Sequence, residues 1–260
     1  MTDYFSRPGL SGSQVATYLA DPIKWYHQYI AKDWPFDPPT PAMQFGTMVH
    51  SMLETGGPVP LCVAVKPDGL DLRTKEGKAW LAGAKEEERT IIDSDQWQSL
   101  NRIWEHVRSN GWLFASLLSG TPEMEFYWDD DDLGECKGKI DLLTDAGAII
   151  DWKTTSCRTE HAFINEIVSR SYDVRMALYR RAVREMTHND FPPVYLVSIQ
   201  TTGGNSVQAF RLSEDWLEDA EARLIVAVDE MREFNLAAHL NRPPKTISQP
   251  RYSVLNLETV

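Results

Sequence analysis

Two aspartates and a lysine are the residues of this chain whose types and spacing best suit chemistry. Asp141 and Asp151 lie in two apolar runs joined by a turn-like segment, and Lys153 follows Asp151 by two residues. This pattern predicts a β-hairpin. Side chains alternate between the faces of a strand, so Asp151 and Lys153 share one face, and Asp141 on the neighbouring strand can meet that face. Two carboxylates there suit a hard divalent cation, with the ammonium neutralising or orienting a reacting group.

Taken alone, this spacing also fits carboxylates that sit in water at strand ends, so the surrounding segments must decide. The run 123–128 alternates polar and apolar residues, which predicts a strand with Glu123 and Glu125 on one face. A third carboxylate could therefore reach the aspartates. Glu125 is preferred because it lies deeper in the strand, although a solvent-facing role for either glutamate stays open. The acidic run 129–132 is interpreted as an exposed turn with solvated charges.

A histidine on a predicted helix is the next candidate. Residues 42–55 are expected to be helical, with His50 on the same stripe as Gly46 and beside Thr47. A lone helical histidine is usually structural or exposed. The small residues around His50 would let a ligand or another backbone approach it.

The elements that must position these residues form a mixed pattern. Short helices are expected near Val15 and after Asp21-Pro22, where aspartate and proline suit the start of a helix. Further predicted elements follow in chain order: a strand at 61–66, helices at 75–89, 93–109 and 112–119, strands at 123–128, 136–143 and 147–153, a helix at 160–187 broken near 169–171, strands at 194–201 and 207–212, and a helix at 213–240. The fold class is therefore α/β, with helices packed on a mixed central sheet and an N-terminal helical region.

The length of 260 residues predicts one domain with several parts. These are N-terminal helices with the histidine (1–57), a helical insertion (58–120), a sheet with helices (121–240) and an irregular tail (241–260). No stretch reaches the roughly 20 apolar residues of a membrane span. The first residues lack the pattern of a signal peptide. Three scattered cysteines favour the reducing cytoplasm and argue against a disulfide framework or an iron–sulfur cluster.

The net charge of −12 at first argues against nucleic acid. Its distribution weakens that objection, because residues 153–184 hold seven basic and three acidic residues. This segment is therefore +4 and the remainder of the chain is −16. A solvated helix face would explain such a cluster equally well.

Taken in order, these motifs resemble a known family. The G-T-x-x-H-x-x-L-E run at 46–54, the glutamate strand, the G-x-I-D and I-I-D-W-K-T runs and a Y-x6-Y helix at 172–179 are similar to the RecB-type nucleases of the PD-(D/E)XK superfamily. The resemblance is strongest to the RecE-like exonuclease VIII enzymes of phage recombination. It implies a restriction-endonuclease-like core, with His50, Asp141, Asp151 and Lys153 in the active site and Glu125 or Glu123 assisting.

The resemblance also implies cofactors and partners. Mg²⁺, with Mn²⁺ as an alternative, would be held by Asp141, Asp151, the Trp152 carbonyl, Glu125 and His50. Double-stranded DNA ends would be the substrate of a homo-oligomeric ring, with a single-strand annealing protein as a further partner. The expected DNA contacts are Arg158, Arg170, Arg175, Tyr172, Tyr179, Ser11 and Ser13. Arg175 stands where the family usually has glutamine, and an always-charged side chain there predicts an altered contact with phosphate.

The residues and the resemblance together predict a Mg²⁺-dependent DNA exonuclease that acts on linear duplexes. The resemblance further implies a 5′-to-3′ direction, which the residues themselves do not reveal, and a role in phage-type recombination. Two alternatives remain. One is an endonuclease or helicase-associated nuclease of the same superfamily. The other is a catalytically silent DNA-end binder or acidic interaction protein.

Overall fold

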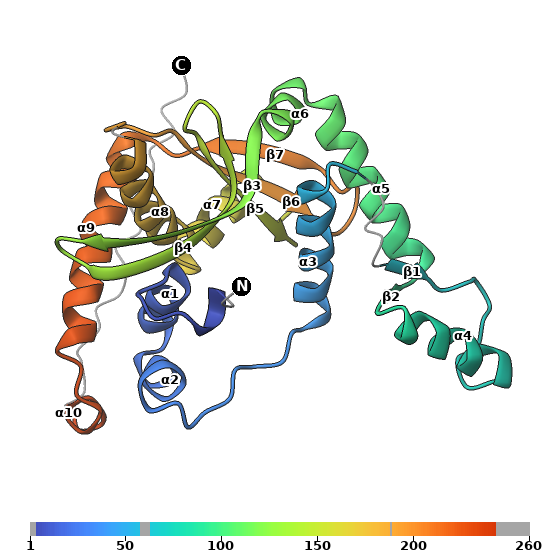
Figure 1. Ribbon diagram of the computed structural model, residues 1–260, viewed down its shortest axis with the longest axis horizontal. Helices are drawn as coiled ribbons and strands as arrows, with labels where there is room; N and C mark the ends of the chain where they lie inside the picture. The colour runs from blue at the N-terminus through green and yellow to red at the C-terminus, as the bar shows by residue number, and fades with distance from the viewer. Residues whose placement is uncertain (1–3, 58–62, 188, 243–260) are drawn as a thin grey trace, which may run out of the picture.

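A five-stranded mixed sheet forms the centre of the computed structural model, which describes residues 4–57, 63–187 and 189–242 (Figure 1). Its strands lie in chain order, and each pair is antiparallel except β5 with β6, which is parallel. The strands are β3 (Gly120–Asp130), β4 (Gly134–Thr144), β5 (Ile149–Thr155), β6 (Val194–Gln200) and β7 (Val207–Arg211). The parallel pair requires a crossover, which two helices between β5 and β6 supply.

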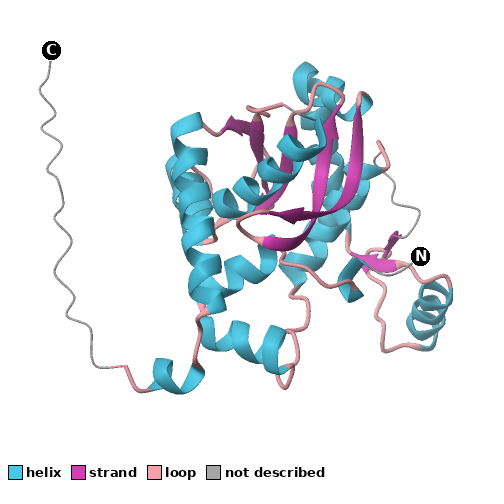
Figure 2. Ribbon diagram, turned by 60° about the vertical axis from the view of Figure 1, so that its left-hand side comes forward, coloured by secondary structure: helices cyan, strands magenta, loops and turns pink. Residues whose placement is uncertain are grey.

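Helices cover both faces of this sheet (Figure 2). The N-terminal part holds η1 (Tyr4–Ser6), α1 (Gly12–Ala20), α2 (Pro22–Trp25), the π-helix η2 (Tyr26–Ala31) and α3 (Pro41–Glu54). The next part holds β1 (Val63–Val65), α4 (Lys75–Glu86), β2 (Thr90–Ile92), α5 (Ser94–Ser109) and α6 (Gly111–Leu118). The remaining helices are α7 (Glu160–Ser169), α8 (Tyr172–Thr187), α9 (Glu214–Arg232) and α10 (Leu236–Leu240).

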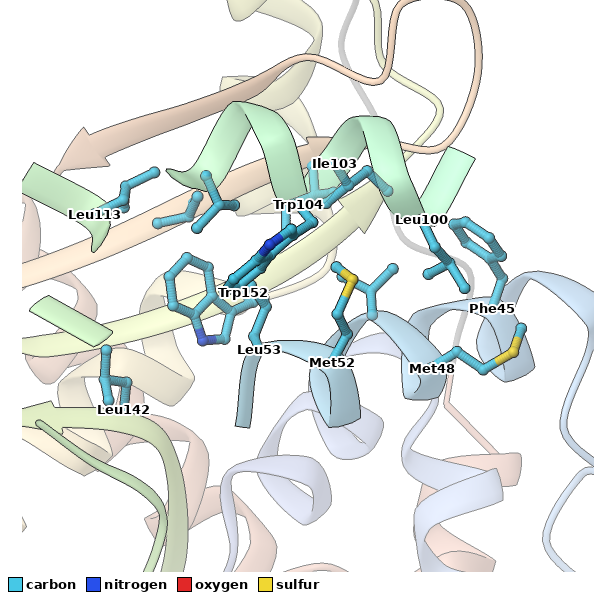
Figure 3. Packing of buried hydrophobic residues seen from close by; sticks show 14 of the residues in the cluster. Phe45, Met48, Met52, Leu53, Leu100, Ile103, Trp104, Leu113, Leu142 and Trp152 are labelled. Carbon is cyan, nitrogen blue, oxygen red and sulfur yellow. The ribbon is translucent and has the colours of Figure 1, made fainter. Parts of the chain in front are cut away.

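Two apolar clusters hold these layers together. On one face, α3, α5 and α6 pack on the sheet around Trp152, which lies among side chains of α3 and α5 (Figure 3). On the other face, α7, α8 and α9 pack on the sheet around Phe163 and Tyr179. A third cluster fastens α1 and α2 to α8 and α9 through Tyr18 and Trp25. The α/β class with flanking and N-terminal helices is therefore confirmed.

Local signals set most of the element boundaries. The Asp21 carboxylate accepts a hydrogen bond from the Lys24 N–H with Pro22 at the first helical position, as expected for a helix start. Ser213 caps α9 in the same way. The break expected near 169–171 is present, and Ser171 has a left-handed φ of 53°.

The structure adds one element and differs from two expectations. The strand β2 was not expected from the sequence, and it pairs in parallel with β1 within residues 58–120. The helix expected over 213–240 ends at Arg232 and restarts at Leu236. The run 129–132 is not simply solvated: the Asp130 carboxylate is largely buried against Arg181 at 2.7 Å. The start of the strand expected at 61–66 and most of the tail at 241–260 lie outside the described residues.

No helix in the described part of the chain combines the length and the apolar character that a membrane crossing needs.

Candidate metal and catalytic centre

The strands around Asp141 separate locally, and this opening holds the candidate centre. The pairing of β4 with β5 ends at Leu142 and Ile150, one step before Asp141 would face Asp151. On the other side, Glu123 and Asp141 lie opposite each other without forming a backbone pair. Glu123 also has a left-handed φ of 50°. A non-glycine residue held in this conformation within a strand is typical of functional sites.

The Asp141 side chain replaces a backbone partner at this opening. Its Oδ2 accepts a hydrogen bond of 2.8 Å from the Trp152 N–H, which would otherwise lack its neighbour on β4. Burial, followed by the nearby charge of Asp151, raises the pKa of Asp141 from 3.8 to about 6. Asp141 is therefore a carboxylate that gains from a nearby cation once it is ionised.

Helix α3, which packs on the face of the sheet opposite to α8, brings His50 close to Asp141. Its Nε2 lies 3.0 Å from the Trp152 carbonyl oxygen, and because a carbonyl only accepts, Nε2 carries the proton. The other nitrogen, Nδ1, then has a free lone pair and lies 3.6 Å from Asp141 Oδ2. Metal-binding histidines are commonly oriented in this way. Gly46 makes the approach feasible, since a Cβ there would lie 2.9 Å from the Thr154 hydroxyl.

The structure favours Glu123 over Glu125 as the third carboxylate. Ligand atoms of His50, Glu123 and Asp141 all lie within 4.8 Å of one another. Glu125 instead accepts a hydrogen bond of 3.1 Å from the Tyr127 hydroxyl and is exposed. Of the two glutamates that the sequence left open, Glu123 is therefore the one whose geometry suits a ligand, because it lies directly opposite Asp141.

Lys139 is a residue of the centre that the sequence reasoning missed. It forms an ion pair with Glu123 and lies two residues before Asp141 on β4. The alternation of side chains along β4 was the signal that could have found it, because Lys139 and Asp141 then share a face.

Asp151 and Lys153 adjoin this group and form an ion pair that is almost fully buried. The Lys153 Nζ lies 3.4 Å from the Trp152 carbonyl oxygen and 5.1 Å from the centre of the Tyr172 ring. The Trp152 carbonyl therefore lies between the histidine and the lysine. Asp151 belongs to the same face as α8, as the alternation of the strand predicted.

Arg175 on α8 lies in the field of these carboxylates. Burial of the guanidinium acts to lower the pKa of Arg175. The nearby groups outweigh this effect, so the pKa is raised overall; the foremost are Tyr179, Asp151 and Asp141. Its Nε is buried without a hydrogen-bond partner. The chain leaves room for Arg175 at Gly12, where a Cβ would lie 2.6 Å from its side chain. A guanidinium with an unfilled donor beside two carboxylates suits a phosphate oxygen.

The other predicted DNA contacts fall in different places. Ser13 is exposed, while Ser11 is the N-cap of α1 and accepts a bond from Gln14. Arg158 is exposed, and Arg170 forms an ion pair of 2.8 Å with Glu166. Tyr179 packs edge-on against the Phe126 ring, with the ring centres 5.6 Å apart, and its hydroxyl lies near enough to Arg175, Asp151 and Asp141 to interact with their charges.

Much of the positive charge on α8 is neutralised within the fold. Arg181 pairs with Asp130, Asp132 and Glu221. Arg184 also pairs with Glu221, and the fully buried Arg180 pairs with Glu214. These three arginines therefore fasten α8 to α9 and to the β3–β4 turn, and the solvated face considered from the sequence is not what explains them.

The residues present fit a divalent cation. One nitrogen and two carboxylate groups converge, and the Nε2 of the histidine is oriented by the Trp152 carbonyl. A positive ion would offset the burial and the repulsion by Asp151 that raise the Asp141 pKa. The arrangement can hold a hard cation next to a buried lysine.

Comparison with known proteins supports this description. A family model described as a PDDEXK-like domain of unknown function, DUF3799, matches residues 25–237. The fold is similar to that of a Eubacterium rectale protein described as a "putative exonuclease", with 13% identity and a TM-score of 0.61 over 93% of this chain and 91% of that one. At this identity the likeness shows the fold alone. No curated protein matches the chain. Since the family model covers most of its length, the chain belongs to the PDDEXK-like domain family DUF3799.

Proposed function

We propose that this protein is a Mg²⁺-dependent DNA exonuclease that hydrolyses phosphodiester bonds of linear duplex DNA from an end. The observation that carries the proposal is the convergence of His50, Glu123 and Asp141 beside the Asp151–Lys153 pair. The family and the exonuclease description of the E. rectale protein support the same reading.

Each side chain of the centre has a role in this proposal. His50, Glu123 and Asp141 would hold Mg²⁺, or Mn²⁺ in its place, with Asp151 and the Trp152 carbonyl available as further oxygen ligands. The ion would supply an activated water and stabilise charge on the phosphoryl oxygens. Lys153, which contacts Asp151 and the Trp152 carbonyl, would orient the attacking water. Arg175 would act on the phosphate through the positive charge of its guanidinium, which lies near Asp141 and Asp151.

The substrate-binding side is proposed from fewer contacts. Ser11 and Ser13 at the start of α1 would hold a terminal phosphate of the DNA. Arg158, Arg170 and Tyr172 would contact the DNA strand that enters the centre. A phage-type recombination role, 5′-to-3′ polarity, a homo-oligomeric ring and a single-strand annealing partner follow from the RecE-like resemblance. An acidic exterior around a basic channel would reconcile the net charge of −12 with DNA.

The test is incubation of linear and closed circular duplex DNA with Mg²⁺, alongside Asp151→Ala. Progressive loss of the linear form alone, abolished in the variant and without Mg²⁺, is the expected result. Cutting of the circle would make the protein an endonuclease. Retention of both substrates with intact binding to DNA ends would instead support the silent end binder.

A further inference from the structure

A large groove lies between the N-terminal segment and the proline-rich loop before α3. Its volume is about 1300 Å³, and its walls come from residues 4–17, from η2 and the loop at 32–37, and from β4. This exceeds the roughly 300–1000 Å³ typical of small-molecule pockets, so an extended ligand fits it better. Its lining includes none of His50, Glu123, Asp141, Asp151 and Lys153.

Two aromatic rings project from a loop that is held in place. Trp34 and Phe36 line the groove and remain 47% and 61% exposed. Trp34 stacks on His27 with ring centres 4.3 Å apart, and Phe36 meets the Tyr29 ring edge-on at 5.3 Å. The Gln28 side chain also donates a hydrogen bond of 3.1 Å to the carbonyl of Pro35. The rings are therefore supported from behind, and an incoming flat group needs little ordering of the loop.

The net positive charge of the residues that line the groove favours a polyanion as its ligand. Four cationic residues line it, against two acidic ones, in a chain whose net charge is −12. The cations are Arg7, Lys24, Lys32 and Lys137. The Lys137 ammonium is held by the carbonyl of Arg7, whereas Lys24 is paired with Asp37. The four cations and two acids together leave the lining with an excess of two positive charges. A neutral or basic protein partner gains nothing from this excess.

Two elements connect the groove with the candidate centre. Lys137 lines the groove and lies four residues before Asp141 on β4, about 13 Å along the strand. Met43 lines it and lies two helical turns before His50 on α3, about 11 Å along the helix. A nucleic-acid strand that leaves the centre can therefore reach the aromatic loop.

We infer that Trp34 and Phe36 form a stacking platform for the unpaired bases of single-stranded DNA next to the nuclease centre. The inference rests on the proposed function for its substrate class. Stacking on aromatic rings combined with a cationic groove is how proteins bind single strands without reading sequence.

The experiment measures binding, in the absence of divalent metal, so that no cleavage is needed. Fluorescence anisotropy compares oligo(dT) of about 16 nucleotides, an abasic oligomer of equal charge and a blunt duplex. Trp34→Ala with Phe36→Ala should weaken oligo(dT) binding about fivefold or more per ring and leave the abasic oligomer within twofold. Trp34→Phe with Phe36→Tyr should restore binding. Phe191→Ala is the matched control, since Phe191 is 62% exposed but lies outside the groove.

The outcomes separate this inference from the proposed function. Equal binding of oligo(dT) and the abasic oligomer by the unaltered protein would overturn the platform, whatever the nuclease assay gives. An unchanged affinity for oligo(dT) in the Trp34/Phe36 variant would also overturn the platform. If the oligomer size of that variant also falls in mass photometry, the loop is a contact between copies of the chain instead. Stacking-dependent binding by a protein that degrades no DNA would support the platform and refute the nuclease.

Discussion

At the residue scale, Asp141 is a carboxylate whose surroundings disfavour its charge. Its pKa is raised to about 6, so the folded protein keeps the proton that the unfolded chain loses near 3.8. The stability that this contributes is complete below about pH 4 and disappears as the pH rises through 6.

This sign gives a prediction for the metal-free protein. Asp141→Asn does not titrate, so its stability relative to the unaltered protein should increase between pH 4 and pH 7, by on the order of 2 kcal/mol. Thermal unfolding of both proteins across that range measures it. Added Mg²⁺ at pH 8 should stabilise the unaltered protein and not the variant. A difference in stability that is flat with pH would contradict the buried carboxylate.

The two glutamates of β3 provide a second residue-scale prediction. Glu123→Gln should weaken Mn²⁺ binding roughly tenfold or more, because it removes a charged group from the convergent set. Glu125→Gln is the matched control on the same strand face and should change binding less than twofold. Calorimetric titration with Mn²⁺ measures both. A larger loss of Mn²⁺ affinity in Glu125→Gln than in Glu123→Gln would make Glu125 the metal ligand.

At the element scale, β4 and α8 lie unusually close together. Gly138 permits this, because a Cβ there would overlap the Phe126 ring and lie 3.0 Å from the Tyr179 ring. The glycine of the G-x-I-D run is thus explained by packing behind the sheet rather than by contact with a ligand.

Gly138→Ala should therefore destabilise the fold by about 1–3 kcal/mol through overpacking. Adding Phe126→Leu creates room, so the double variant should be more stable than the sum of the two single changes. Urea unfolding of the four proteins in this cycle provides the coupling. Strict additivity would mean that the two residues do not share the space.

The arginines between the end of β5 and the end of α8 include structural ones and proposed DNA contacts, which gives another prediction at this scale. Arg181→Gln breaks partly buried pairs with Asp130 and Glu221, so unfolding should become easier by about 2 kcal/mol or more, with DNA affinity unchanged. Arg158→Gln, on an exposed residue, should weaken DNA binding and leave stability within about 0.5 kcal/mol. Denaturation and DNA-binding assays on both variants check this. If Arg181→Gln weakened DNA binding and Arg158→Gln lowered the stability, the structural and DNA-binding roles of the two arginines would be reversed.

At the scale of the whole molecule, the centre forms where two layers meet. Helix α3 approaches from one face of the sheet and α8 from the other, and the opening between β4 and β5 lets His50 and Lys153 reach the same carbonyl of Trp152. The net charge of −12 does not describe this centre, because Lys139, Lys153 and Arg175 lie among its carboxylates.

Local sequence determined most of the elements and the type of chemistry. The hairpin of Asp141 and Asp151, the alternation that places Asp151 with Lys153, and the capped helix starts all depend on neighbours in the chain, whose geometry is short-range. The parallel pair β1–β2 was not predictable in this way, since its partners are separated by α4 and the short strands carry little pattern.

Tertiary structure alone decided which charges act together. Alternation placed Glu123 and Glu125 on one face, but only the pairing of β3 with β4 and the left-handed backbone at Glu123 set it opposite Asp141. The arginines of α8 could not be told apart in the sequence, but packing against α9 pairs Arg180, Arg181 and Arg184 with acidic residues of that helix. Ion pairs and metal ligands join residues distant in the chain, so their partners are fixed by packing.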